Sequence, residues 1–427
     1  QISLPWDYAC TSGSAVVGYL EEQKIDTMVP TNGQLFMLAN GILGGLVVLT
    51  NFVLLPIILQ MILYAATIIY IGSHLSLKLK ETDPVTGEKQ MGESMSQKDA
   101  MMFPIIGSVS LVTLYVFYKF LSPYWVNLLL TTYLSILGIA ALAATISPVL
   151  ERVVPIPAKV LDRKFHITFQ LPGPLKRKEG PHDFRFTVLD IVSHVVSLLV
   201  AIAWLVTKHW CLHNIFAIAF SIQMISLVSL GRFQVAFILL SGLFIYDIFW
   251  VFGTDVMVTV AKSFEGPAKL VFPVSFDPWK QSILGLGDIV IPGIFIAMCL
   301  RFDQHLFEEG LEGAPVKKKD DVIDIHQGFH KVYFTSAMVA YCLGLATTGA
   351  VMFVFQHAQP ALLYLVPFCL GALLLTAVIR REWSHVWTYK EEEDNKDDKK
   401  EATDADTAAE GTQDDNDESS MESKKSQ

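Results

Sequence analysis

The sequence predicts an all-α polytopic membrane protein with about nine transmembrane helices. Only 17% of the 427 residues are charged, against about 25% in soluble proteins, and the mean hydropathy is +0.43. The net charge of −10 comes mainly from acids near the C-terminus, so the rest of the chain is close to neutral. These observations exclude a basic nucleic-acid surface. Five cysteines are also too few for a secreted disulfide scaffold.

Nine mostly apolar runs, bounded by charges, glycine or proline, are long enough to cross a bilayer. The first is ambiguous, because apolar character extends from Leu35 to Ile71 with polar and proline interruptions. It forms either one long tilted span with an interfacial lead-in or two short spans, which would move the N-terminus to the other side. In chain order the runs are approximately Phe52–Ser73, Phe103–Leu121, Tyr124–Ile146, Thr187–Thr207, Asn214–Leu230, Phe233–Gly253, Ser282–Leu300, Val332–Phe355 and Pro360–Val378.

The chain divides into three regions on composition. Residues 1–51 form a lumenal N-terminal segment with the interfacial lead-in, and residues 52–382 form the nine-span membrane domain. Residues 383–427 are predicted to be an acidic, disordered cytosolic tail, because they lack apolar content.

The loop charges predict the orientation, since lysine and arginine are retained on the cytosolic side. With nine spans, the basic loops and the C-terminal tail fall on one side, and the N-terminus falls on the lumenal side. Lys424 and Lys425, fourth and third from the end, resemble a dilysine retrieval signal of endoplasmic-reticulum membrane proteins.

Two acids lie inside apolar runs, where an ionisable side chain costs several kcal/mol and marks a functional candidate. Asp247 lies six residues before Gly253, and Asp288 lies six residues after Ser282. At a rise of 1.5 Å per residue both are expected about 9 Å below the same membrane face. Helices joined by one loop are usually neighbours, so the two carboxylates are expected to face each other.

Facing carboxylates in a low-dielectric site cannot both stay ionised, and they share a proton. Aspartic proteases use this arrangement: the ionised acid takes a proton from water, and the protonated acid donates to the scissile carbonyl. A single intramembrane aspartate has a plainer interpretation, as a helix-to-helix hydrogen bond or part of an ion path. The equal depth of Asp247 and Asp288 favours catalysis.

The residues around the acids suit the approach of a peptide backbone. Gly285 and Gly287 flank Leu286 directly before Asp288, and glycine admits another backbone closely. Pro292 and Gly293 follow the acid and predict a kink or break in that span. The last span opens on Gln359, Pro360, Ala361 and Leu362, and a broken helix start there exposes backbone groups to an extended peptide.

Three motifs in order, Tyr246-Asp247, Gly285 to Asp288 and Pro360 to Leu362, resemble the presenilin and signal peptide peptidase family of intramembrane aspartyl proteases. The resemblance covers roughly residues 52–382. It implies a nine-span protease of the endoplasmic-reticulum membrane that cleaves signal-peptide remnants and type II transmembrane segments. Asp247 and Asp288 would be catalytic. The residues that would shape the substrate site are Tyr246, Gly285, Leu286, Gly287, Gln359, Pro360, Ala361 and Leu362.

The resemblance also bears on partners. The connection between the catalytic spans, about Thr254 to Gln281, is short, which implies a single chain that acts without secretase subunits. Membrane lipid and peptide substrates are the implied partners, together with a possible homo-oligomer. The first fifty residues and the connection from Asp303 to Lys331 depart from the family pattern.

Other polar residues have structural interpretations. Asp190 and His194 share one helix face and are expected to form an interfacial hydrogen-bonded pair rather than a proton relay. Cys10 and Cys211, both on the predicted lumenal side, either pair or stay single.

His209 and His213 lie near each other in a lumenal turn, but no second pair at zinc spacing and no His-Glu-x-x-His motif accompany them. The sequence therefore predicts no metal and no other cofactor. Two rival functions remain at this stage: a related protease of later compartments, and a non-proteolytic channel or scaffold whose acids bind an ion.

Overall fold

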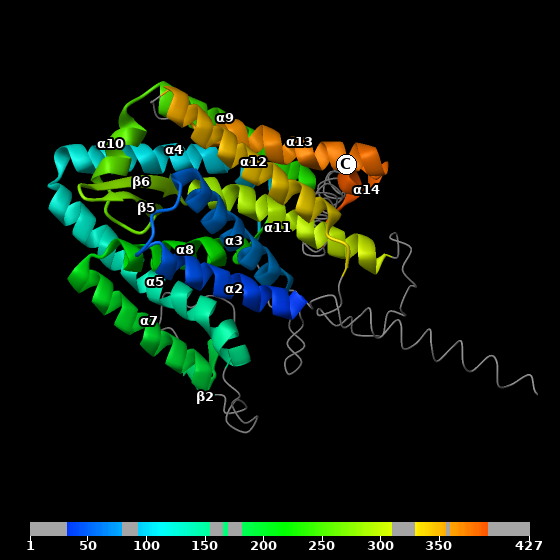
Figure 1. The fold of residues 1–427 in the computed structure, drawn as a ribbon. Helices are drawn as coiled ribbons and strands as arrows, with labels where there is room; N and C mark the ends of the chain where they lie inside the picture. The colour runs from blue at the N-terminus through cyan, green and yellow to red at the C-terminus, as the bar shows by residue number, and fades with distance from the viewer. Residues whose placement is uncertain are drawn as a thin grey trace, which may run out of the picture.

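The computed structural model describes residues 32–78, 93–153, 165–169, 182–309, 329–355 and 359–391. Within these residues nine helices are long and apolar enough to cross a membrane, which confirms the predicted number. They form one bundle (Figure 1). The nine are α3 (Ile57–Lys78), α4 (Gln97–Phe120), α5 (Pro123–Val153), α7 (Val188–Thr207), α8 (Trp210–Leu227), α9 (Phe233–Phe252), α11 (Gly287–Glu308), α12 (Val332–Phe355) and α13 (Leu362–Arg380).

Helix α11 is the central helix of the bundle. Of the residues in its most apolar stretch 83% are buried, against 6% in α4 at the periphery. Helices α3, α8 and α12 pack directly around it. Since lipid is as apolar as leucine, this burial reflects packing between helices.

The N-terminal apolar stretch forms two helices, α2 (Asn32–Leu49) and α3, which lie side by side in opposite directions (Figure 1). Near the start of α2, the Phe36 ring packs under Arg152 at the end of α5. Just beyond its other end, Asn51 donates a hydrogen bond to Cys211 at the start of α8. Helix α2 therefore reaches from one end of the bundle to the other, as the two-span alternative requires.

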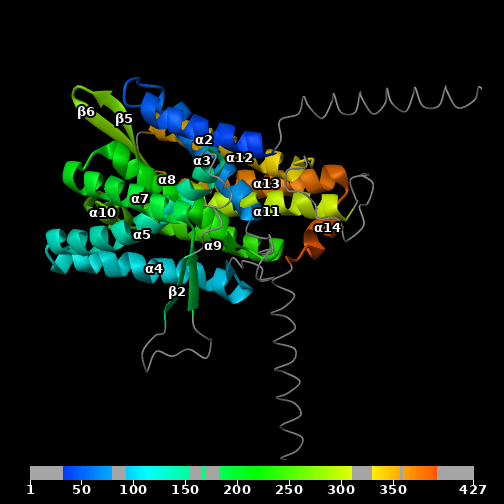
Figure 2. The same cartoon turned by 90° about the horizontal axis from the view of Figure 1, so that it is seen from below.

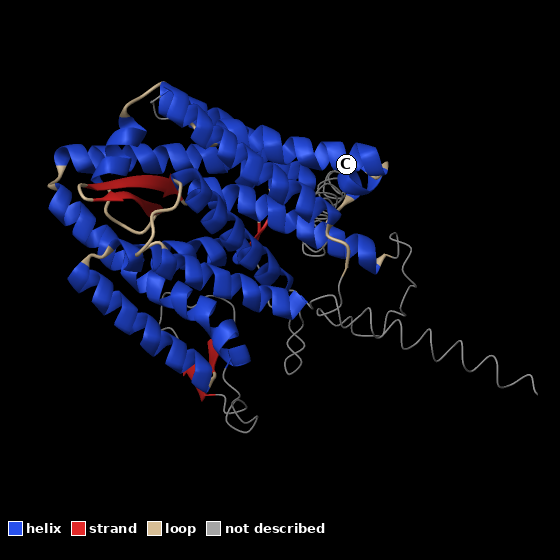
Figure 3. Ribbon diagram, viewed as in Figure 1, coloured by secondary structure: helices blue, strands red, loops and turns tan. Residues whose placement is uncertain are grey.

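The predicted start of the seventh span is wrong. Residues Trp279–Gly285 form strand β6, which pairs antiparallel with β5 (Lys269–Phe276), and α11 begins only at Gly287. Figure 3 shows this hairpin among the helices. Helix α11 also continues through Pro292 to Glu308, so the predicted break after Asp288 is absent and the non-helical backbone comes before that acid.

Two further strand pairs and a short helix lie between the long helices. Strand β1 (Glu93–Ser94) pairs in parallel with β4 (Val228–Ser229), and β2 (Phe165–Phe169) pairs with β3 (His182–Phe186) in a hairpin that projects from the bundle (Figure 2). The short helix α10 (Val256–Ser263) follows α9.

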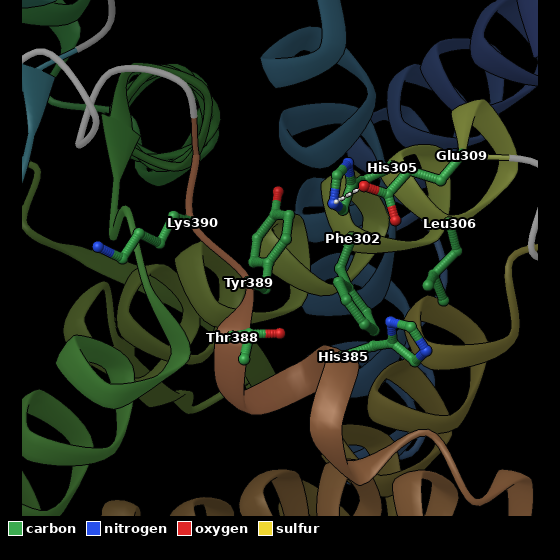
Figure 4. A pocket seen from close by; sticks show the side chains of 8 residues that line it. All are labelled: Phe302, His305, Leu306, Glu309, His385, Thr388, Tyr389 and Lys390. Carbon is green, nitrogen blue, oxygen red and sulfur yellow. Dashed lines mark ion pairs between the residues drawn. The ribbon is translucent and has the colours of Figure 1, made fainter.

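The folded part of the chain continues past residue 382, where the sequence predicts that the tail begins. Helix α14 (Trp383–Thr388) packs against α13 and α9, and Tyr389 and Glu391 after it contact the end of α11. We call residues 383–391 the C-terminal clasp. A cavity of about 350 Å³ lies beside these contacts and is lined by Phe302 and His305 of α11 and by Tyr389 (Figure 4). Tryptophans and a buried tyrosine supply the apolar contacts of this short segment.

A buried ion pair fixes the clasp. The Arg301 Nε donates to Glu391 Oε1 at 2.7 Å, with both side chains at most 3% exposed. Arg301 Nη1 also donates to Ser76 of α3 at 3.0 Å, and Ser229 donates to the second oxygen of Glu391. The pair thus joins α3, α11, β4 and the clasp, because each buried charge must find polar partners.

We expect Glu391→Gln to lower the stability of the detergent-solubilised protein by about 3–5 kcal/mol, because it leaves the buried Arg301 charge without its counter-charge. The matched control is Glu309→Gln, which removes an exposed pair with His305 worth about 0–1 kcal/mol. Thermal unfolding followed by tryptophan fluorescence compares the two. Equal shifts in Tm would show that the buried pair is unimportant.

Candidate active site

Asp247 lies in the last third of α9, a helix that is otherwise apolar around it. Its side chain is only 4% exposed. The carboxylate Oδ2 accepts a hydrogen bond of 3.0 Å from the backbone N–H of Leu362, the first residue of α13. The first N–H groups of a helix lack partners within the helix and favour negative charge, so the start of α13 stabilises a carboxylate at this position.

Asp288 is the second residue of α11 and lies half-buried at its start. Its backbone carbonyl accepts a hydrogen bond of 3.2 Å from the buried Tyr341 hydroxyl of α12. Helices α9 and α11 contact each other and both contact α13, so Asp247 and Asp288 lie on neighbouring helices. The two predicted acids are therefore together, although the expected depth of six helical residues for Asp288 is wrong because a strand occupies those residues.

The predicted glycines form the turn between β6 and α11. Leu286 N–H donates to the Ala268 carbonyl at 3.2 Å, which closes the hairpin just before the helix. A methyl group added to Gly285 would lie 3.4 Å from Asp288 Oδ2, whereas one added to Gly287 would meet only Ile291 at 3.9 Å. Bare backbone at Gly285 therefore borders the acid directly.

The other predicted substrate residues divide between the site and the packing around it. Pro360 is buried, Ala361 is the N-cap of α13 and Leu362 bonds Asp247, so this motif reaches the acids through its backbone. Gln359 lies half-buried just before them. Tyr246 differs, because its ring lies against Gly107 of α4 and near Trp250.

Two positioning residues were not found from the sequence. Asn214 of α8 donates to the Val271 carbonyl at 2.7 Å and accepts from the Val271 N–H at 2.9 Å, both buried, so its amide holds β5 as a neighbouring strand would. Tyr341 orients the start of α11. A lone asparagine in the apolar α8 run was the available signal, since polar groups inside spans are rarely kept without partners.

The strand next to Asn214 has a second anchor at its start. Lys269 Nζ donates to the carbonyls of Ala261 and Phe264, each at 2.9 Å. Burial lowers the pKa of the Lys269 ammonium, and the charge of Glu265 opposes that shift. The Lys269 carbonyl in turn lies 3.0 Å from His213 Nε2.

The remaining polar candidates have structural roles in the described residues. Asp190 forms a capping box with Thr187 and accepts from Ser147, and the His194 ring bonds the Asp190 carbonyl. His209 caps α8. The predicted Cys10–Cys211 alternative and Lys424 and Lys425 fall on residues outside the described ranges.

Known proteins resemble this chain over most of its length. A sequence profile of the signal peptide peptidase family matches residues 87–393. Signal peptide peptidase of Mus musculus is 43% identical over 70% of this chain and 75% of that protein. A probable intramembrane protease of Schizosaccharomyces pombe is 33% identical over 77% of this chain and 93% of that protein. A solved presenilin family intramembrane aspartate protease aligns at a TM-score of 0.44 with 16% identity, over 75% of this chain and 99% of that one.

The multi-pass bundle, taken with the family profile and the related signal peptide peptidases, defines an intramembrane aspartic protease. The chain belongs to the signal peptide peptidase family. The fold class, the family and the enzyme class expected from the sequence are confirmed.

We expect Gly285→Ala to slow cleavage on the order of tenfold, because the new methyl group lies against Asp288 and displaces a substrate backbone from it. Thermal stability should stay unchanged, since 3.4 Å is an ordinary contact distance. Gly287→Ala is the control and should cleave at nearly the original rate. A loss of activity in Gly287→Ala as large as in Gly285→Ala would contradict the assigned geometry.

Asn214→Leu should destabilise the protein by about 1–3 kcal/mol and reduce cleavage, because it leaves the buried N–H and C=O of Val271 unpaired. Asn40→Leu serves as the control, since the Asn40 amide bonds only to the preceding turn of α2 among the bonds described. Tm and the rate of peptide cleavage are measured for both. Matching values for the two variants would argue against a positioning role for Asn214.

Proposed function

We propose that Asp247 and Asp288 are the catalytic pair of this protease. The single observation that carries the proposal is the position of both acids where α9, the start of α11 and the start of α13 meet. We assign the ionised role to Asp247, because an N–H donor stabilises the charged form of a carboxylate. Asp288 then carries the shared proton.

In the proposed reaction each acid both gains and gives up one proton within one catalytic cycle. Asp247 removes a proton from water as the water oxygen attacks the scissile carbonyl carbon, and Asp288 gives its proton to the carbonyl oxygen. When the C–N bond breaks, Asp247 passes its proton to the leaving amine, and Asp288 takes one back from a hydroxyl of the intermediate. Both acids thereby return to their starting states.

The substrate must present an extended backbone to these acids, because a helix hides its peptide bonds in its own hydrogen bonds. Strand β6 runs directly to Gly285, and strand edges and bare glycine accept an added peptide segment. We propose signal-peptide remnants as substrates on the names of the relatives, and other type II transmembrane segments on the resemblance of the sequence motifs to the family. Helix-breaking residues near the cleavage point should speed the reaction.

Asp247→Asn and Asp288→Asn should each reduce cleavage of a synthetic signal peptide by at least about 10²–10⁴-fold, because each removes one half of the acid–base pair. The assay uses the purified single chain in detergent, without added subunits. Normal thermal unfolding and retained insertion control for misfolding. Retained cleavage in either variant would refute the catalytic assignment, and inactivity of the purified original chain would show that a partner is needed.

We further propose that the protein resides in the endoplasmic-reticulum membrane with Lys78, Arg301 and Arg380 on the cytosolic side. Arg301 of α11 bonds Ser76 near the end of α3, which ends at Lys78. Arg380 bonds Glu382, which accepts from Tyr333 beside Asp303 of α11, so the three basic residues lie at the same end of the bundle. Basic residues are retained in the cytosol. Helix α2 returns to this end, which favours a cytosolic position for Asn32 over the predicted lumenal N-terminus.

Single cysteines in an otherwise cysteine-free protein test this orientation in sealed microsomes. Asn32→Cys should react with an impermeant maleimide at once, whereas Ser122→Cys in the α4–α5 turn should react only after permeabilisation. The reverse pattern would show that the protein has the opposite orientation.

In cells, replacing Lys424 and Lys425 with serine should move the protein to later compartments if they form the retrieval signal, and an unchanged location would exclude that role.

A further inference from the structure

A groove runs along the outer surface of α12 and α13, away from the two acids. It encloses about 1200 Å³. Its apolar walls include Val339, Leu343 and Leu375, each more than half exposed. Gly371 forms part of its floor, and a side chain at that position would extend into open space. The groove therefore opens toward the lipid phase.

The length of the groove matches one leaflet of the bilayer. On α12 it extends from Lys331 to Leu343, which is about 18 Å at the helical rise of 1.5 Å per residue. Half of a hydrocarbon core of roughly 30 Å is close to this length. A substrate helix that crosses both leaflets would contact the groove over only half of its own length, whereas one acyl chain fits along it.

One end of the groove carries the positive charge of Lys331. The His330 ring lies beside it as a further polar group, and the lining residues in the described part of the chain include no carboxylate. Lys331 Nζ lies 2.9 Å from His74 Nε2 of α3, which holds the ammonium in place. Burial lowers the pKa of Lys331 to about 8, with the charge of Asp303 acting in the opposite direction, so the ammonium stays mostly protonated at neutral pH.

An acid of α11 fixes the start of α12, the helix that forms one wall of the groove. Asp303 of α11 accepts from the backbone N–H groups of Tyr333 and Phe334 at 3.0 and 2.8 Å, and so caps the start of α12. Just inside the charged end, the hydroxyls of Ser336 and Thr376 bond to each other across the groove at 3.0 Å. Charge, hydroxyls and apolar surface thus follow one another along the groove.

This order is the order of groups in a phospholipid: phosphate, ester and acyl chain. Basic pockets between transmembrane helices on the cytosolic side bind anionic headgroups. We propose that the groove binds an anionic phospholipid of the leaflet at the Lys331 end, with its phosphate at His330 and Lys331 and one acyl chain between α12 and α13. The site is separate from the catalytic pair.

Photoactivatable phosphatidylserine with a diazirine in its acyl chain tests the proposal on the full-length protein in phosphatidylcholine nanodiscs. Labelling, mapped by mass spectrometry, should concentrate on Val339, Leu343 and Leu375. The matching phosphatidylcholine probe should label these residues less. Uniform labelling of lipid-facing helices, or equal labelling by the two probes, would overturn the proposal, as would self-association of the protein that excludes both probes from the groove.

Two variants locate the binding chemistry. Gly371→Leu fills the groove and should abolish the concentrated labelling, whereas Gly44→Leu adds the same side chain to open space on α2 and should not. Lys331→Gln should weaken phosphatidylserine binding about fivefold, because this is the contribution of one lysine to binding at an anionic surface. Lys208→Gln, at the end of α7, is the charge control. Undiminished labelling of Gly371→Leu would exclude the groove as the site.

Discussion

The structure depends on keeping a carboxylate inside an apolar bundle. Asp247 is almost completely buried, and an uncompensated charge there would cost more than most single interactions contribute. The backbone N–H of Leu362 offsets part of this cost. That bond requires α13 to begin beside α9, which explains why the proline motif lies at a helix start. Pro360 has no N–H to lose, and the N–H of Leu362 binds the acid.

Asp288 is positioned differently. The β5–β6 hairpin, whose β5 edge is bound by Asn214, ends at Gly285, and α11 starts immediately afterwards. Asp288 thus lies at a helix N-terminus rather than within a helix. Both acids therefore lie beside backbone that is not fully hydrogen-bonded, which in a membrane is tolerated only when it is buried in protein or borders water. Hydrolysis of a peptide bond also requires water beside the two acids.

The opposite end of α11 is held as firmly as its start. Arg301 and Asp303 connect it to α3, to the start of α12 and to the C-terminal clasp. Buried ionic contacts of this kind fix geometry more than they add stability. Since α11 is also the most buried span, its first turn is positioned by the whole bundle, and the surfaces of α12 and α13 that face away from it remain available to lipid.

Sequence alone determined the membrane class, the number of long apolar helices and the pair of acids, because each follows from composition or from residues a few positions apart. It also singled out Pro360 to Leu362, but as a surface for substrate rather than as a donor to Asp247. It missed the β5–β6 hairpin, since Ser282 to Gly285 are apolar enough to extend the following span. These residues are a strand because they pair with β5, which Asn214 binds from 57 residues before Val271. The clasp, the direction of α2 and the groove likewise depend on contacts between distant segments, so only the tertiary structure decided them.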